Sequence, residues 1–255
     1  MLLNERSFDR LFCDTYETSK FDLFFNESFK SDPVFNHAVI NDSFLASIDS
    51  ENVEQNTRLL QEINTEAHSH NFSPTIFVED FWQKSQSFQK VAVEEEYFVG
   101  GFMEILSMAV KNFPESTKKT TVEEGVNFKL WNQIFMSSYS IPPYWEDELV
   151  RREELFSTLH ETKLFIARNP QNKMAGCMLT HRMPSDYLGI YCVGTLPEMR
   201  HQGVASALIA EAARIAADNG CRYLTLQTIT ADGVVPLYLK LGFNIEFRRV
   251  VLQRQ

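Results

Sequence analysis

The sequence predicts an α/β (or α+β) protein in two parts. Three observations support this fold class. Short apolar segments typical of strands alternate with longer segments of helical periodicity. The 255 residues exceed the roughly 150 residues of an average domain. Gly residues are unevenly distributed, with two before residue 117 and eight after it.

A boundary between the two parts is predicted near residue 116. The polar segment Asn112–Lys119 contains a proline and lies between the apolar Phe102–Val110 and the strand-like Thr120–Val122. Polar segments with proline are typical of linkers. We therefore expect an N-terminal domain over residues 1–116 and a C-terminal domain over residues 117–255.

The N-terminal half is predicted to contain two helices and two strands. Apolar residues recur at helical spacing after Asp49 and Ser50, either of which is suited to cap a helix. The Phe-rich residues 1–48 support no assignment. In order, the expected elements are a helix over Ser50–His70, a strand over Thr75–Val78, a helix over Phe81–Glu96 entered through Asp80, and, after Gly100–Gly101, a strand over Phe102–Val110.

The C-terminal half is predicted to alternate strands and helices. Pro142 and Pro143 interrupt a helical region because Pro cannot continue a helix. Gly220 and Gly242 are suited to end helices. In order, the expected elements are a strand at Thr120–Val122, helices over Asn127–Ser138 and Glu146–Leu159, strands over Leu164–Ala167, Met174–His181 and Tyr187–Leu196, a helix over Val204–Asn219, a strand over Tyr223–Ile229, a short helix from Pro236, and a strand over Phe243–Leu252.

Composition excludes several classes of protein. Hydrophobic residues make up 44% of the chain and charged residues 23%, which excludes a wholly disordered chain. No apolar run is long enough to span a bilayer, and the first residues do not resemble a signal peptide. A cytoplasmic protein with no membrane partner is therefore expected. The four cysteines include no C-x-x-C pair, so no zinc ribbon or other metal site is expected, and Cys177 and Cys192 are predicted to be small core residues.

Charge is divided unequally between the halves. Residues 1–116 hold 8 Lys and Arg against 20 Asp and Glu, whereas residues 117–255 hold 16 against 14. The N-terminal half would repel phosphates, so a nucleic-acid partner is not expected. The C-terminal half is compatible with a small polyanion. The alternative is that the acidic surface serves only solubility.

The strongest chemical signal is the strand-to-helix junction at residues 190–208. An apolar strand ends before Pro197, and a polar loop leads into an Ala-rich helix. Free N–H groups and the positive end of the helix dipole make such a junction suited to an anion. Gly203 permits a phosphate to approach the backbone, and Arg200 and His201 add basic groups. Neither a Walker P-loop nor a G-x-G-x-x-G fingerprint is present.

This junction resembles the signature of the GNAT family, the acyl-CoA-dependent N-acetyltransferases. The family pattern [Q/R]-x-x-G-x-[G/A] is similar to Arg200–Ala205, which follows Thr195-Leu196-Pro197. A second landmark, a Tyr near the start of a short helix that ends in Gly-Phe, is similar to Pro236–Phe243 with Tyr238. One helix and one strand separate the two landmarks, as in the family. The resemblance covers about residues 117–255 and implies a GNAT fold.

The resemblance also implies a role for each matching position. The loop around the helix start would hold the pyrophosphate of acetyl-CoA, and the edge of the preceding strand would pair with the pantetheine amides. A backbone N–H of that strand would polarise the thioester carbonyl. Tyr238 would protonate the departing thiolate as a general acid, in direct transfer of the acetyl group to an amine. The implied acetyl-CoA-binding residues are Val193, Gly194, Thr195, Arg200, His201, Gln202, Gly203, Val204, Ala205 and Ser206.

Two positions depart from the family pattern. Many relatives carry a Glu that acts as a general base where this chain has Leu226. Many also carry an Asn that forms a hydrogen bond to pantetheine where this chain has Ala231. These departures motivate the alternative of a non-catalytic acyl-CoA-binding or sensing module. The acceptor is not identified by the sequence. Its candidate neighbours are the aromatic Tyr139, Tyr144 and Trp145, the acidic Glu146, Asp147 and Glu148, and the polar His181 and Asp186.

The N-terminal half is predicted to be a degenerate GNAT-like domain without a CoA site. Gly101-Phe102 echoes Gly242-Phe243, each interpreted as a helix end followed by Gly-Phe and a strand. No R-x-x-G-x-[G/A] segment accompanies the first of these, and Glu79-Asp80 precedes the second predicted helix. This acidic half would favour a cationic amine acceptor. The alternative is an unrelated helical cap.

Overall fold

The structure is a computed structural model, and it describes most of the chain. The described residues are 9–10, 12–29, 32–41, 44, 52–79, 85–113, 120–125, 127–158, 160–183 and 186–254. They form two compact units. Of the described residues, the first unit holds those within 9–105, 228–235 and 245–254, and the second holds those within 106–227 and 236–244.

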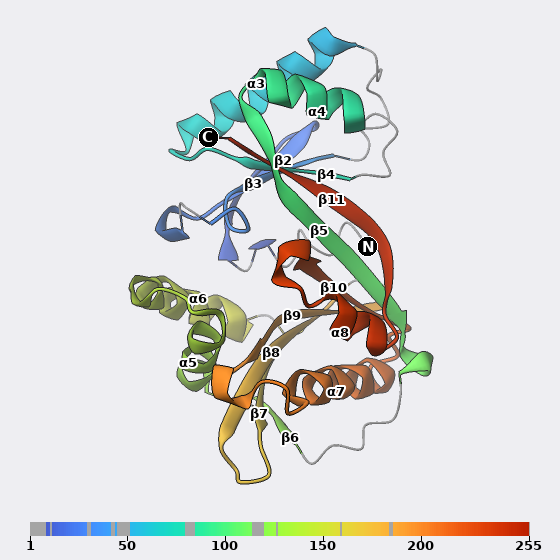
Figure 1. Cartoon of the computed structure of the whole chain (residues 1–255). Helices are drawn as coiled ribbons and strands as arrows, with labels where there is room; N and C mark the ends of the chain where they lie inside the picture. The colour runs from blue at the N-terminus through green and yellow to red at the C-terminus, as the bar shows by residue number, and fades with distance from the viewer. Residues whose placement is uncertain are drawn as a thin grey trace. The chain divides into compact units, whose positions relative to one another are not determined.

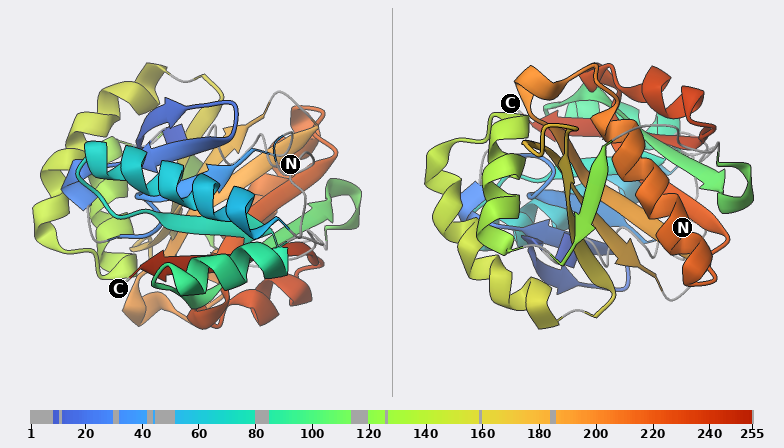
Figure 2. Two further views of the ribbon diagram at one scale, coloured as in Figure 1. Left: turned by 90° about the horizontal axis from the view of Figure 1, so that it is seen from above. Right: turned by 90° about the horizontal axis from the view of Figure 1, so that it is seen from below.

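The first unit is a mixed sheet with two helices on one face (Figure 1 and Figure 2, left). Its strand order is β1-β2-β3-β4-β11-β5. Strands β3 and β4 are parallel, whereas β1–β2, β2–β3 and β4–β11 are antiparallel. The elements are β1 (Asp14–Glu17), β2 (Phe21–Phe25), η1 (Glu27–Phe29), β3 (His37–Ile40), α3 (Val53–Ser69), β4 (Thr75–Glu79), α4 (Ser85–Glu94), β5 (Tyr97–Ala109) and β11 (Asn244–Arg254).

Apolar side chains of α3 and α4 pack on alternate residues of these strands. Helix α3 begins at Asn52, whose side chain accepts a hydrogen bond from Gln55 N at 3.0 Å. The core that results joins residues from both helices and from strands far apart in the sequence. It includes Leu23, Ile40, Leu60, Ile63, Ile76, Phe88, Val91, Val250 and Leu252.

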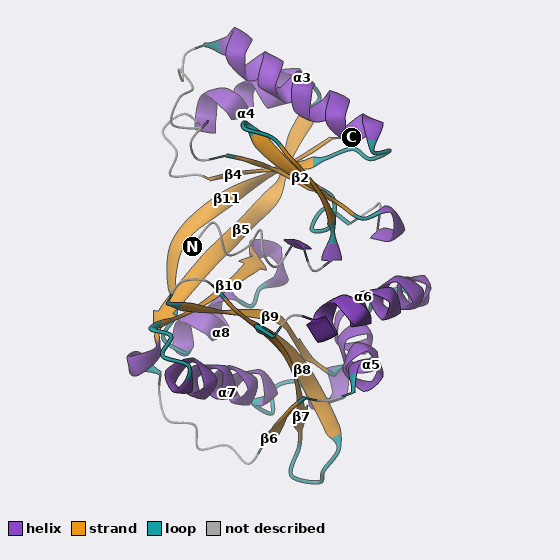
Figure 3. Ribbon diagram, turned by 180° about the vertical axis from the view of Figure 1, so that it is seen from behind, coloured by secondary structure: helices purple, strands orange, loops and turns teal. Residues whose placement is uncertain are grey.

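The second unit is a mixed sheet with helices on both faces (Figure 3). Its strand order is β6-β7-β8-β9-β10-β5, and α5 and α7 contact strands β7, β8 and β9 from opposite faces (Figure 2, right). The elements are η2 (Val110–Asn112), β6 (Thr121–Glu124), α5 (Phe128–Tyr139), η3 (Pro143–Trp145), α6 (Glu146–Thr158), β7 (Thr162–Arg168), β8 (Met174–Arg182), β9 (Tyr187–Thr195), η4 (Pro197–Met199), α7 (Val204–Asp218), β10 (Tyr223–Ile229) and α8 (Val235–Lys240). The turn η5 (Thr230–Asp232), between β10 and α8, belongs to the first unit.

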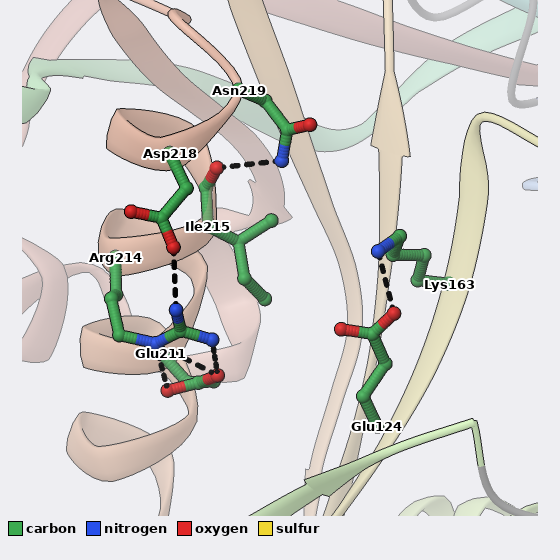
Figure 4. Close-up of polar contacts among 7 residues, drawn as sticks. All are labelled: Glu124, Lys163, Glu211, Arg214, Ile215, Asp218 and Asn219. Carbon is green, nitrogen blue, oxygen red and sulfur yellow. Dashed lines mark hydrogen bonds and ion pairs between the residues drawn. The ribbon is translucent and has the colours of Figure 1, made fainter.

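Helix α7 is amphipathic, with one apolar face that is buried and one charged face that is exposed. Its apolar side, including Leu208 and Ile209, is buried. On its outer side, Arg214 forms ion pairs of 2.5 Å with both Glu211 and Asp218 (Figure 4). Pairs at this spacing stabilise an exposed helix by only about 0.2–0.5 kcal/mol each. Burial of the apolar side is therefore the main interaction that holds the helix against the sheet.

Strands β9 and β10 are parallel but pair over only part of their length. Their register ends at Thr225 opposite Gly189, whereas β9 continues to Thr195. The carboxyl-terminal half of β9 therefore pairs with β8 on one side and is released from β10 on the other. This half of β9 leads directly into the loop before α7.

Most expected helices and strands are confirmed, with ends shifted by a few residues. One expectation is wrong: Gly100–Gly101 does not follow a helix end but lies inside β5, a continuous strand from Tyr97 to Ala109. The strand continues through Gly101 at φ 156°, a backbone conformation that glycine allows, so the echo with Gly242-Phe243 is not a structural one. The predicted caps Asp49 and Ser50, the residues Asp80 to Trp82, and the linker at 114–119 lie outside the described residues.

The compact units do not follow a single cut of the sequence at residue 116. Strand β11 closes the chain, yet its residues from Ile245 onward belong to the first unit, where Val250 pairs opposite Val78. The predicted domain boundary between residues 116 and 117 therefore stays a prediction.

Candidate functional site

A β-bulge interrupts β9 in its released half. The register with β8 shifts between Cys177 and Leu179, and Cys192 has a positive φ of 53°. A bulge leaves one residue out of the hydrogen-bonded ladder and turns its peptide groups. The thiol of Cys177 lies beside the bulge, with its Sγ donating to the carbonyl oxygen of Cys192 at 3.6 Å.

The loop after β9 presents a row of N–H groups. It passes through η4 and reaches Gly203, the N-cap of α7, at φ 81°, with His201 also left-handed at φ 61°. The first helical bond runs from Ala207 N to Gly203 O at 3.0 Å. Within the described chain, the N–H groups of residues 201–206 have no hydrogen-bond acceptor. These donors, together with the helix dipole, make a site suited to an anion.

Side chains of the loop brace it internally. Arg200 donates from Nη2 to the Ser138 carbonyl at 3.0 Å and from Nε to the Thr195 carbonyl at 3.4 Å. Gln202 donates from Nε2 to the Glu198 carbonyl at 3.1 Å. The Arg200 guanidinium therefore joins the end of α5 to the end of β9 and adds its positive charge beside the row of backbone N–H groups.

The edge of β9 lies close to the end of α5. Tyr139 donates its hydroxyl to the Val193 carbonyl at 3.0 Å. A Cβ at Gly194 would lie 2.7 Å from the Cβ of Ser138, a separation that real Cβ atoms do not tolerate, so only glycine allows this approach. Residues 193–195, identified from sequence as one group, are thus adjacent to α5 as well as to the loop.

Tyr238 is buried, with 8% of its surface exposed. It lies in α8, and its ring meets the ring of Phe243 edge to face at a centroid distance of 5.9 Å. Phe243 N also donates to the Tyr238 carbonyl at 3.1 Å. The Gly-Phe pair after the helix therefore fixes the position of the tyrosine ring.

The titratable side chains with shifted pKa values near β9 include His181 and two cysteines. Leu226 is buried in β10 and cannot take a proton. His181, opposite Gly189 at the other end of β9 from the bulge, is buried, and burial lowers the pKa of its imidazole, opposed by the charge of Glu161. Burial raises the pKa of the Cys177 thiol to about 12 and that of the Cys192 thiol well above 9. Both cysteines are therefore neutral thiols. The prediction of a core residue is confirmed for Cys177, whereas Cys192 lies at the bulge and is only partly buried by accessible surface.

The candidate acceptor residues divide by exposure. Tyr139 and Tyr144 are exposed, whereas Trp145 is buried. Glu148 is also buried and pairs with Arg151 at 3.1 Å and Arg152 at 2.9 Å. No group of three or more metal-ligating side chains occurs in the described residues, and no helix among them is long and apolar enough to cross a membrane.

Comparison with known proteins gives a family match and several structural matches. Residues 128–243 match the model of the "Acetyltransferase (GNAT) family". The sequence matches no curated protein. Among solved structures, a GCN5-related N-acetyltransferase from Kribbella flavida has a TM-score of 0.70 and 13% identity, covering 98% of this chain and 92% of that one.

Two further structures share the fold over nearly the whole chain. A GCN5-related N-acetyltransferase from Sphaerobacter thermophilus has a TM-score of 0.65 and 14% identity, covering 92% of this chain and 80% of that one. A tandem GNAT protein from the clavulanic acid biosynthesis pathway has a TM-score of 0.63 and 10% identity, covering 91% and 77%. At these identities the likeness concerns the fold, and it supports a layout of two GNAT-like domains.

Proposed function

We propose that this chain transfers an acetyl group from acetyl-CoA directly to an amine, because residues 128–243 match the GNAT acetyltransferase family model. The observation that carries the proposal is the row of unsatisfied N–H groups at residues 201–206, which directly follows a bulged strand released from its neighbour. The pyrophosphate of CoA suits the row of N–H groups, and the amide groups of the pantetheine arm suit the released strand edge.

In the proposed reaction, the backbone of β9 aligns the thioester for attack. The loop N–H groups hold the pyrophosphate, and an N–H among residues 193–195 polarises the thioester carbonyl. The amine nitrogen forms a bond to the carbonyl carbon, and the carbon–sulfur bond breaks. Tyr238 gives its proton to the departing thiolate, the attacking amine loses one to water, and a proton from water then restores the Tyr238 hydroxyl.

Direct transfer is favoured over an acyl-enzyme by the state of the cysteines. A cysteine nucleophile acts as the thiolate, which requires a lowered pKa. Burial instead raises the pKa of both thiols at the bulge. Cys177 and Cys192 are therefore assigned no covalent role.

The acceptor class is proposed from charge. Residues 1–116 carry 20 acidic against 8 basic side chains, a balance that favours a cationic amine over an anionic one. The proposal assigns acetyl-CoA as acyl donor and no metal.

One observation favours a second candidate, a non-catalytic acyl-CoA-binding module. Leu226 is apolar and buried at the position where many relatives carry their base. Release of free CoA thiol from acetyl-CoA, measured with a panel of polyamines, aminoglycosides and peptides, separates the two. Amine-dependent thiol release supports the transferase, whereas CoA binding without turnover on any amine supports the module.

A further inference from the structure

The bulge in β9 is held by side chains from outside the ladder. Beside the bond from Cys177 to the Cys192 carbonyl, the Val193 carbonyl accepts from Tyr139 and the Thr195 carbonyl accepts from Arg200. A bulge disrupts the regular ladder locally, so strand pairing alone does not fix the peptide groups there. Side chains from β8, α5 and the loop before α7 supply the missing restraint.

Tyr139 is anchored for this task by an aromatic column along α5. Its ring packs on Phe135 at a centroid distance of 5.2 Å, and Phe135 stacks on Trp131 at 5.1 Å. Trp131 is fully buried and donates from Nε1 to the Met178 carbonyl at 3.0 Å. The column therefore fixes the tyrosine ring relative to β8, the neighbour of β9.

Packing alone does not require the tyrosine hydroxyl. Half of the Tyr139 surface is exposed, so water is available to satisfy the hydroxyl without a protein acceptor. The helix α5 ends at Tyr139, its C-cap Ser140 has φ 55°, and Arg200 donates to the Ser138 carbonyl. Arg200 thus links the Ser138 carbonyl, next to Tyr139, to the Thr195 carbonyl of β9. This link keeps the end of α5 beside the strand and favours the hydroxyl bond to Val193 over one to solvent.

We propose that Tyr139 is a positioning residue for acetyl transfer. It holds the peptide group of Val193 in the bulge, so that the N–H among residues 193–195 points at the thioester carbonyl of acetyl-CoA. This inference rests on the proposed function. Catalytic donors that are fixed before the reaction need no reorganisation, and loss of one ordering bond weakens the polarisation. Tyr139 acts through the backbone and does not itself touch the reacting atoms.

The test compares Tyr139→Phe with Tyr223→Phe in the full chain. Both remove one hydroxyl from the second unit, but the Tyr223 hydroxyl makes no hydrogen bond within the described residues, and its ring stacks on Tyr187. The first readout is the carbonyl stretch of bound acetyl-CoA labelled with ¹³C at the carbonyl. The second is the rate of acetyl transfer to hydroxylamine, a small nucleophile that makes little demand on an acceptor site.

The parent and Tyr223→Phe are expected to lower the stretch of the bound thioester equally, relative to free acetyl-CoA. In Tyr139→Phe, the carbonyl stretch of bound acetyl-CoA is expected to move part of the way back to the frequency of free acetyl-CoA. Acetyl transfer is expected to be slower by roughly 3- to 10-fold, the range that one neutral hydrogen bond supports. The CoA affinity of Tyr139→Phe is expected to stay within about threefold of the parent on the same grounds. An unchanged stretch and rate in Tyr139→Phe, with only a lower melting temperature, would overturn the inference. Absence of acetyl-CoA binding by the parent would overturn the proposed function itself, and the inference with it.

Discussion

Substitution of Gly203 by Glu tests the pyrophosphate site at the start of α7. The N-cap at φ 81° is left-handed, so any side chain there adds strain of about 1–2 kcal/mol. The carboxylate adds a negative charge at the opening of the N–H row. At about 5 Å from one phosphate charge and an effective dielectric constant of about 20, the repulsion is about 3 kcal/mol. CoA affinity should therefore fall by roughly 100-fold or more.

A matched control lies at the other end of the same helix. Gly220 has φ 71°, is exposed, and has no atom within 4 Å of a built Cβ. Gly220→Glu therefore adds the same charge and a similar strain, but away from the proposed site. Calorimetric titration with CoA should show weakened binding for Gly203→Glu and parental binding for Gly220→Glu. Parental affinity in a folded Gly203→Glu variant, or equal loss in both variants, would refute the assignment.

Three further predictions follow from the same arrangement. Tyr238→Phe should slow transfer by about 10²–10⁴-fold with little change in CoA affinity, because a general acid acts only as the thiolate leaves; equal turnover where chemistry limits the rate would remove Tyr238 from the mechanism. Calorimetry should give one CoA per chain, and a value of two would show that the N-terminal half retains a site. Burial lowers the pKa of His181, so the unfolded chain binds its proton more readily and stability should fall as pH drops below about 6.5. Melting temperatures of His181→Asn should fall less over that range than those of the parent, and an identical pH profile would contradict this.

The elements with strong local signals could be predicted from sequence. Helix α7 has a clear apolar periodicity between Gly203 and Gly220, and the prolines at 142 and 143 mark the break after α5. The strands β2 and β3 could not be recognised because their residues are buried without the alternation that identifies a half-exposed strand. The Phe-rich sequence of β2 and the short apolar sequence of β3 are equally compatible with a buried helix.

The candidate site also contains one part that could be predicted from the sequence and one part that could not. The loop from Arg200 to Ser206 was recognisable because its glycine and its place before an Ala-rich helix are local features. The bulge at Cys192 has no such mark, since a positive φ at a non-glycine residue is imposed by tertiary contacts. The bonds from Tyr139 to Val193 and from Arg200 to Ser138 join residues more than fifty positions apart, and no periodicity reports contacts of that kind.

The most direct test of the account is to follow the acetyl group itself. In a single turnover with ¹³C-acetyl-CoA and an amine identified by the thiol-release panel, mass spectrometry measures where the label goes. Direct transfer at the site described predicts label in the amine product, formed at the rate of thiol release, and no labelled protein at any time point. Label accumulating on Cys177, Cys192 or another residue before it appears in the amine would contradict the account.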